Sequence, residues 1–316
     1  MIIAQRWVAM EFGGPGALQR TEVEVPDPAG GQVTIDVHAC GMNPADAKHI
    51  APGQSRSLLP LTLGFEVSGI VSAAGAEAGL AVGDEVAAEV RGGYTTAITV
   101  PVSDVRPKPS PLTFAEAANL LLVGTTAAEL LHVSHAQSGD TVLLHGGAGA
   151  VGASALQQAR NLGIRVIATA SRANAEFVRR FGGTPVEYGP GLLERVRAAA
   201  PEGLAAALDT VGSKEAGDVS LALVKDRSRV VTIADAPRAK ADGYVFIGAS
   251  NPASGPFRAQ ARSRIIAMAA GGDLIVPMAA TFPFDHAPAA FALLTSPHAP
   301  GKIALVRDVN SAPEPR

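Results

Sequence analysis

Residues 141–172 read TVLLHGGAGAVGASALQQARNLGIRVIATASR, and this stretch decides the fold. A short apolar run is followed by glycines at GxGxxG spacing, by a helical segment and by a second apolar run. Glycines at this spacing permit a tight turn, a close approach of backbone N–H groups to a pyrophosphate, and tight packing of the helix on the strand. The stretch therefore predicts a βαβ unit that binds a dinucleotide at the N-terminus of its helix, with an ordinary βα unit and a glycine-rich turn as the alternative. The residues expected to contact the cofactor here are Gly147, Ala148, Gly149, Ala150, Val151 and Gly152.

The residues after the second apolar run distinguish NAD from NADP. An acidic residue at this point would bind the adenosine ribose 2′-hydroxyl of NAD, whereas an arginine accommodates the 2′-phosphate of NADP. This chain has Ser171 and Arg172 here, and the nearest downstream acid is Glu176. A guanidinium and a hydroxyl attract a phosphate that a carboxylate would repel, so we expect NADPH to be the cofactor. The alternative is structural, with Ser171 as a helix cap and Arg172 as a solvated surface charge.

The composition excludes several classes of function. The chain has 316 residues, of which 47% are hydrophobic, and this length is enough for about two domains. Its net charge of −3 offers no electrostatic basis for binding nucleic acid or an anionic membrane. Cys40 is the single cysteine, which excludes an intrachain disulfide and a four-cysteine zinc site. The sequence shows neither an apolar run of the roughly 18 residues that a membrane span needs nor a secretory signal, so we expect a cytoplasmic protein.

The order of the segments predicts two kinds of domain. Residues 1–110 contain short β-prone runs separated by glycine and proline, which predicts a small, irregular, antiparallel β domain. A proline-rich link at 105–112 leads into a region in which strands alternate with helices, and this pattern predicts a doubly wound parallel sheet. Beyond that region we expect helices near 257–270 and 287–294 and a strand at 302–306. The strands of the parallel sheet are expected at 142–144, 164–168, 184–187, 204–208, 229–233 and 244–247.

Short motifs along nearly the whole chain resemble the landmarks of one superfamily. They are CGMNPADAK at 40–48, GFEVSGIV at 64–71, VGDEV at 82–86, VGTTA at 123–127, LDTVG at 208–212 and GKIALV at 301–306. In this order they resemble the medium-chain dehydrogenase/reductase superfamily, in its zinc-independent quinone oxidoreductase-like branch. The resemblance implies an α/β fold class, with a GroES-like irregular β domain plus a doubly wound parallel Rossmann domain. It implies a GroES-like catalytic domain at 1–120 together with 257–316, and a Rossmann NADPH-binding domain at 121–256.

Two residues within these motifs argue against a catalytic zinc. Zinc-dependent alcohol dehydrogenases of this superfamily have a cysteine where this chain has Asn43 and a histidine where it has Phe65. Catalytic zinc needs about three protein ligands from cysteine, histidine and carboxylate, and Cys40 does not stand at the ligand position. Without a Lewis acid the oxidation of an alcohol is disfavoured, whereas an acceptor that is already electrophilic needs no such help. We therefore expect no metal.

The resemblance also nominates active-site residues. Asn43, in the NPxD motif, is expected near the nicotinamide and the substrate, although Asn43-Pro44 also reads as a helix N-cap followed by proline. Lys48 is expected to orient a carbonyl or to contact a cofactor phosphate, and Tyr94 to line the substrate cleft. A solvated lysine and a core tyrosine are the alternatives. Further cofactor contacts are expected from Asn43 itself and from Thr125, Thr126, Ser171, Arg172, Tyr188, Asp209, Phe246, Ile247 and Lys302.

Together these features predict a zinc-independent, NADPH-dependent reductase that transfers a hydride to a quinone or an α,β-unsaturated carbonyl. One alternative is an enoyl-type or biosynthetic reductase of a specialised enone or imine, which would differ only in its substrate pocket. An alternative of another class is a non-catalytic NADPH-binding redox sensor. Because no side-chain proton donor stands out, we expect solvent or the cofactor ribose to supply the proton. The resemblance further implies a homodimer, with an edge strand near 244–247 as the expected interface.

Overall fold

The computed structural model describes residues 1–53, 55–248, 254–296 and 299–307. Within these residues no helix combines the length and the apolar character needed to cross a membrane. The chain divides into two compact units. The first unit combines Met1–Leu122 with Ile275–Arg316, and the second consists of Val123–Leu274.

Helix α9 (Ser254–Ala270) belongs to the second unit, so the boundary expected before Phe257 falls inside a helix. Arg258 of α9 donates from Nε to Glu129 Oε2 at 2.6 Å, and both side chains are largely buried. Glu129 belongs to helix α3 (Leu121–Val133), which begins at the division between the units. This buried ion pair holds α9 against α3, and the division therefore follows α9 instead of preceding it.

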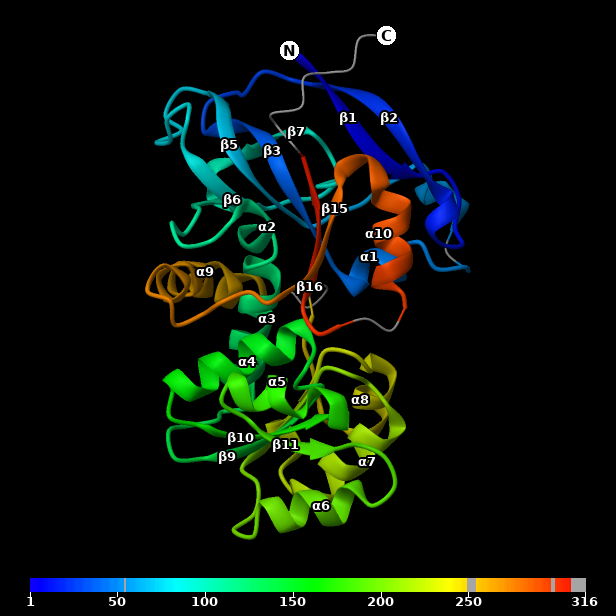
Figure 1. The fold of residues 1–316 in the computed structure, drawn as a ribbon, viewed down its shortest axis with the longest axis vertical. Helices are drawn as coiled ribbons and strands as arrows, with labels where there is room; N and C mark the ends of the chain where they lie inside the picture. Colours follow the sequence, from blue (N-terminus) through cyan, green and yellow to red (C-terminus); the bar gives the residue numbers. More distant parts are fainter. Residues whose placement is uncertain (54, 249–253, 297–298, 308–316) are drawn as a thin grey trace. The chain divides into compact units, whose positions relative to one another are not determined.

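The second unit is built on a parallel sheet with the strand order β11-β10-β9-β12-β13-β14. Figure 1 labels three of these strands, β9, β10 and β11. β9 comes first in the chain, and it pairs with β10 on one side and with β12 on the other. The strand order therefore reverses beside β9, and in doubly wound sheets ligands bind at the carboxyl ends of the strands at such a point. The strands are β9 (Thr141–His145), β10 (Arg165–Ala170), β11 (Thr184–Glu187), β12 (Ala206–Asp209), β13 (Val230–Thr232) and β14 (Val245–Phe246).

Helices cover both faces of this sheet. Val142 and Leu144 pack in one apolar cluster with residues of α3, α4 and α5, whereas Leu143 packs in another with residues of α6, α7 and α8. Because both faces are buried, the strands read as continuous apolar runs in the sequence. The helices are α4 (Ala150–Asn161), α5 (Ala175–Arg180), α6 (Leu192–Ala199), α7 (Lys214–Leu223) and α8 (Ala236–Asp242).

The first unit contains two sheets, which are mainly antiparallel (Figure 1). The larger has the order β15-β16-β3-β5-β6-β8, with β7 also paired to β3, and the smaller has the order β2-β1-β4. The helices are α1 (Pro44–His49), α2 (Phe114–Ala117) and α10 (Ala287–Leu294). The strands are β1 (Ile2–Ala9), β2 (Leu18–Val25), β3 (Gln32–Met42), β4 (Leu61–Thr62), β5 (Glu66–Ala74), β6 (Glu85–Glu89), β7 (Ala97–Pro101), β8 (Val105–Pro107), β15 (Met278–Pro283) and β16 (Lys302–Val306).

The last part of the chain returns to this unit through β16, which pairs antiparallel with β3. Ile303 lies opposite Met42, so Lys302 comes to the end of β3 where helix α1 begins. Two features differ from the expected antiparallel domain. β15 pairs with β16 in parallel, and Val105–Pro107, expected to be part of a link, forms β8 against β6. The prolines conceal this strand in the sequence, because proline is tolerated in edge strands such as β8.

Candidate functional site

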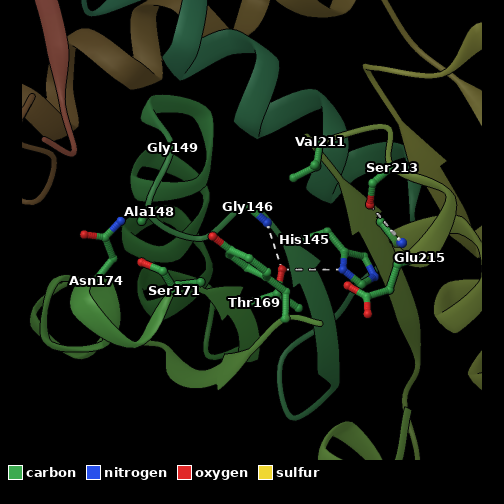
Figure 2. Close-up of a pocket in the computed structure, with 13 residues that line it drawn as sticks. His145, Gly146, Ala148, Gly149, Thr169, Ser171, Asn174, Val211, Ser213 and Glu215 are labelled. Atoms are coloured by element: carbon green, nitrogen blue, oxygen red, sulfur yellow. Dashed lines mark hydrogen bonds between the residues drawn. The ribbon is translucent and has the colours of Figure 1, made fainter. Parts of the chain in front are cut away.

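The glycine-rich turn between β9 and α4 is held by side chains of neighbouring elements. Gly146 has a φ of +87°, which favours glycine, and its N–H donates to Thr169 Oγ1 at 3.1 Å. Thr169 Oγ1 also lies 3.5 Å from His145 Nδ1 (Figure 2). His145 Nε2 lies 3.1 Å from Ser220 Oγ, so the imidazole ties β9 to α7 as well as to β10. The turn is thereby fixed in position.

Two of the three glycines of the motif, Gly147 and Gly152, are required by close packing. A Cβ on Gly152 would lie 2.2 Å from the carbonyl oxygen of Gly146, and one on Gly147 would lie 2.6 Å from Ala168 Cβ in β10. Gly149 is less constrained, since its Cβ would lie 3.3 Å from the same Gly146 oxygen. Turn, helix and strand are therefore in direct contact, as the GxGxxG spacing predicts, and Gly146 adds a required glycine outside the motif.

Helix α4 begins at this turn with an N-terminus suited to an anion. Its N-cap is Gly149, and its first turn, Ala150, Val151 and Gly152, carries no charged side chain. The first N–H groups of a helix find no acceptor within the helix, and the helix dipole adds partial positive charge there. With neither a capping side chain nor an acid of its own, this helix end can bind an anion such as a pyrophosphate.

A cavity of about 430 Å³ lies at the carboxyl ends of the strands on both sides of β9. Figure 2 shows Ser171 and Asn174 on one side of the view and Ser213 and Glu215 on the other, with Gly146 and Thr169 between them. This is the point where the strand order reverses, and it is where a ligand of a doubly wound sheet is expected. The lining residues are His145, Gly146, Ala148, Gly149, Thr169, Ala170, Ser171, Asn174, Tyr188, Val211, Ser213, Glu215 and Ala216.

The structure brings part of the predicted cofactor set together at this cavity. The predicted residues that line it are Ala148, Gly149, Ser171 and Tyr188. The predicted residues that form the adjoining turn and the start of α4 are Gly147, Ala150, Val151 and Gly152. The GxGxxG stretch and the residue after β10 therefore meet in space, and their contact with a cofactor stays a prediction.

Arg172 lies on the exposed turn that follows β10. Its side chain is 88% exposed, and Nη2 donates to Glu187 Oε2 at 3.2 Å. Glu187 ends β11 and lies beside Ala170 in the register of the sheet, so this acid stands close to the expected phosphate position. Exposed ion pairs contribute about 0–1 kcal/mol, and the guanidinium can therefore exchange Glu187 for a phosphate.

Asp209 has a structural task in the loop after β12. Its side chain is 3% exposed, and its carboxylate accepts from the N–H groups of Val211 and Gly212 and from the hydroxyl of Thr232, at 2.8–3.2 Å. This carboxylate is also absent from the lining of the cavity among the described residues. Asp209 therefore shapes the loop that forms part of the cavity wall. Its hydrogen bonds favour this structural role over the direct cofactor contact expected from the sequence.

His145 is neutral in the folded protein at neutral pH. Burial lowers the pKa of its imidazole to about 4, although the charges of Asp209 and Glu215 act in the opposite direction. The cavity therefore gains no positive charge from this histidine, and its role is to hold Thr169 and the turn.

The first unit gathers a buried polar cluster at the end of β3. Lys302 Nζ donates to the Met42 carbonyl at 2.7 Å and to Asn43 Oδ1, and Asn43 Nδ2 donates to Glu66 Oε1 at 3.2 Å. The exposed fractions of Lys302, Asn43 and Glu66 are 4%, 3% and 1%. Burial raises the pKa of Glu66 to about 7 and lowers the pKa of Lys302, while their opposite charges limit both shifts. Two predicted site residues, Asn43 and Lys302, are thus in direct contact.

Tyr94 is not retained as a candidate for contact with a substrate. It is fully buried, and its hydroxyl donates to Asp46 Oδ2 at 2.9 Å. The structure therefore favours the alternative, a tyrosine of the core. Asp46 also accepts from the N–H groups of Asn43 and Gly64, which ties the start of α1 to the loop before β5. Lys48, by contrast, is exposed in the last turn of α1, where its ammonium is accessible.

The remaining predicted cofactor residues are mostly buried. Thr125 and Thr126, on α3, have exposed fractions of 0% and 7%. Phe246 ends β14 half-buried, and Ile247 packs in the apolar cluster that contains α3 and α4. These four residues lie outside the lining of the cavity given above, and their contact with the cofactor stays a prediction.

The residues at the expected zinc position do not fit a zinc ion. The side-chain oxygen of Asn43 accepts from the Lys302 ammonium, whose charge would repel a metal cation. Phe65 offers no ligand atom, and its ring packs edge-on against His49 with the centroids 5.2 Å apart. Burial raises the pKa of the Cys40 thiol to about 12, so the thiolate that zinc requires is disfavoured. Throughout the described part of the chain, no group of His, Cys, Asp and Glu is arranged to hold a metal.

Several polar residues that line the cavity were not predicted from the sequence, among them Asn174, Ser213 and Glu215. Ser213 caps α7, since its Oγ accepts from the N–H of Ala216 at 3.1 Å. Glu215 Oε2 accepts from the N–H of Gly189 at 3.0 Å. A positional signal could have found Ser213 and Glu215, because they follow β12, which flanks β9 on the side opposite to β10.

Comparisons with known proteins identify relatives of this chain. Two family models match it, the alcohol dehydrogenase GroES-like domain at residues 29–110 and the zinc-binding dehydrogenase at residues 184–305. The human quinone oxidoreductase is 37% identical over 174 residues, 53% of this chain and 53% of that protein. A mycobacterial protein solved in complex with NADPH has 28% identity and a TM-score of 0.82, with 96% of this chain and 99% of the other covered. The CurK enoyl reductase has 26% identity and a TM-score of 0.85, with the same 96% and 99% covered.

These similarities agree with the fold and with the sequence motifs. The chain spans about half the length of the curated relatives it matches, whereas the solved structures match over nearly their whole length. The name of the second family model refers to zinc, but the residues around Asn43 do not form a zinc site. The chain belongs to the medium-chain dehydrogenase/reductase superfamily.

Proposed function

We propose that this protein is an NADPH-dependent reductase that transfers a hydride to a quinone or an α,β-unsaturated carbonyl. One observation carries the proposal: the N-terminus of α4 is free of acids and follows a glycine turn fixed by close packing, beside the cavity where the strand order reverses. The similarity to quinone oxidoreductases and to a protein solved with NADPH supports it. Ser171 and Arg172 favour NADPH over NADH, because a hydroxyl and a guanidinium bind a 2′-phosphate.

The second unit would hold the cofactor. Backbone N–H groups in the first turn of α4 would bind the pyrophosphate, and the close packing of Gly152 on Gly146 keeps this backbone accessible. Arg172 would release Glu187 and pair with the 2′-phosphate, while Ser171 would donate its hydroxyl. When bound, NADPH supplies the hydride. The chain itself supplies binding, orientation and the exclusion of water.

In the first unit, Asn43 and Lys302 are the candidates for binding the oxygen of the acceptor. The ammonium of Lys302 has three hydrogens, and among the described residues it donates to Met42 and Asn43. A third N–H and the second amide hydrogen of Asn43 could stabilise the negative charge that develops on that oxygen. Quinones and enones are already electrophilic, so this hydrogen bonding suffices in place of a Lewis acid. Solvent would supply the proton.

The test mixes the purified protein with NADPH and a panel of quinones, enones and enoyl thioesters, and follows the oxidation of NADPH by absorbance. We expect turnover with a quinone or a simple enone, and we expect EDTA to leave that turnover unchanged. Loss of turnover in EDTA would contradict the conclusion that Asn43 and Phe65 do not form a metal site. If NADPH binds but no acceptor oxidises it, the reductase proposal fails and the non-catalytic redox sensor is favoured.

A second candidate, an enoyl-type reductase, is favoured by the similarity to the CurK enoyl reductase. Reduction of an enone and reduction of an enoyl thioester both deliver a hydride to the β-carbon of an electron-poor alkene, so the two candidates differ in the acceptor. A kcat/KM for an enoyl thioester more than about tenfold above that for any quinone would favour this second candidate.

We also propose a homodimer that forms through β14. This strand ends the order of the parallel sheet and is paired only with β13 among the described strands, so its outer edge can pair with a second copy. Light scattering tests this directly: the mass of a dimer supports the proposal, and the mass of a monomer contradicts it.

A further inference from the structure

Glu215 places a carboxylate in the wall of the cavity in the second unit. It lies in the first turn of α7, and Oε2 accepts from the N–H of Gly189 at 3.0 Å, which fixes the side chain. Its other oxygen, Oε1, has no hydrogen-bond donor among the residues that the structure describes. A carboxylate only accepts hydrogen bonds, so this oxygen offers an acceptor to a ligand in the cavity.

A negative charge is unexpected in a cavity that is suited to a phosphorylated ligand. Phosphates are attracted to the start of α4 and to Arg172, whereas Glu215 would repel them. Figure 2 shows Glu215 across the cavity from Ser171 and Asn174, the residues on the side of the expected 2′-phosphate. The part of the ligand that reaches Glu215 must therefore be uncharged and must donate a hydrogen bond.

The residues near Glu215 expose apolar surface on which a flat base could stack. Tyr188 directly precedes Gly189, the residue that binds Glu215, and Tyr188 is 56% exposed. Val211, on the loop after β12, is 53% exposed. Both residues line the cavity, and both leave apolar surface in water that a purine ring would cover.

We infer that Glu215 recognises the exocyclic amino group of the adenine through Oε1. This inference rests on the proposed function, because it requires the adenosine of the cofactor to occupy the cavity. The amino group of adenine donates a hydrogen bond, whereas hypoxanthine carries an oxygen at the same position. That oxygen would face Glu215 Oε1, and because both atoms are acceptors, neither would gain a hydrogen bond. Glu215 therefore selects the adenine dinucleotide over its hypoxanthine analogue.

Calorimetric titration of the whole protein with NADPH and with its deaminated, hypoxanthine-containing analogue tests the inference. The two ligands differ only in the base, so the comparison in the parent protein is decisive without any variant. We expect the analogue to bind about tenfold or more weakly. In Glu215→Gln the two affinities should fall within about threefold of each other, because a glutamine amide accepts from adenine and donates to hypoxanthine.

Glu194→Gln is the matched control, since Glu194 is exposed in the first turn of α6 in the same unit and lies outside the lining of the cavity. This variant should keep the preference of the parent protein. Equal binding of both dinucleotides by the parent, or a preference that persists in a folded Glu215→Gln, would overturn the inference and leave the proposed cofactor intact. Failure of the parent to bind NADPH at all would overturn the proposed function itself, so the two failures are distinguishable.

Discussion

The ammonium of Lys302 donates to the side-chain oxygen of Asn43, although the two residues are 259 positions apart in the chain. The contact exists because β16 returns to the first unit and pairs with β3. It determines the orientation of the Asn43 amide, whose nitrogen then donates to Glu66. Lys302 is therefore as much a part of the candidate acceptor site as Asn43.

Replacing Lys302 by methionine should destabilise the first unit. The change removes the donor to Asn43 Oδ1 and to the Met42 carbonyl, and it leaves Glu66 without the nearby positive charge. Breaking such a buried arrangement costs about 2–4 kcal/mol in the free energy of unfolding, which urea denaturation would measure. Lys48→Met is the control, because Lys48 is exposed. Equal stabilities of the two variants would contradict this role for Lys302.

Replacing Gly152 by alanine should weaken both stability and cofactor binding. Alanine is the better helix former by about 1 kcal/mol, so any loss must come from packing. The new Cβ would lie 2.2 Å from the Gly146 oxygen and 2.9 Å from Gly147 Cα, and neither backbone atom can move away without opening the turn. We expect a net loss of about 1–3 kcal/mol in thermal unfolding and weaker binding of NADPH. Gly16→Ala, where a Cβ meets nothing within 4 Å, should be close to neutral.

Arg172→Gln should reduce the affinity for NADPH about tenfold and leave the affinity for NADH unchanged, because only NADPH has the 2′-phosphate. Losing the exposed pair with Glu187 should have little effect on the fold, since such pairs contribute little. Calorimetric titration of both dinucleotides measures the effect. Arg179→Gln provides the control, because Arg179 is an exposed arginine of α5 that pairs with Glu176. A parent protein that binds NADH as tightly as NADPH would refute the assignment of Arg172.

The stability should depend on pH through His145. The pKa of this histidine falls from 6.5 to about 4 on folding, because burial favours the neutral imidazole. Its stabilising contribution is complete above pH 6.5, and it is lost as the pH falls to about 4, since the unfolded chain binds the proton first. The decline is at most about 1.4 kcal/mol per pH unit.

His145→Gln removes this titration, and so it isolates the effect from other groups. The difference in the free energy of unfolding between the parent and the variant should shrink as the pH is lowered from neutral, measured by urea denaturation at several pH values. A difference that stays constant with pH would show that His145 is not buried in its neutral form.

Much of the fold could be predicted from the sequence because its signals are local. Strands buried on both faces leave continuous apolar runs, and residues 142–144 were expected as a strand and lie in β9, where all three side chains are fully buried. The division between the units could not be predicted in the same way. It depends on the buried pair between Arg258 and Glu129, which joins helices that are distant in sequence.

The residues of the candidate site were likewise predictable where the sequence signal is local and not where it depends on distant contacts. The turn around Gly152 is a local pattern, and its close contacts were predicted by the motif. Tyr94 was nominated by resemblance, but its burial against Asp46 depends on tertiary packing. Glu215 was missed although it follows β12, because only the folded sheet brings the start of α7 to the wall of the cavity.

The most direct measurement is a crystal structure of this protein grown with NADPH. We predict density for the pyrophosphate at the N–H groups of Ala150, Val151 and Gly152, for the 2′-phosphate at Arg172, and for adenosine in the cavity between Tyr188 and Glu215. Cofactor density elsewhere, or saturating NADPH that leaves the turn empty, would contradict the proposed function at its foundation.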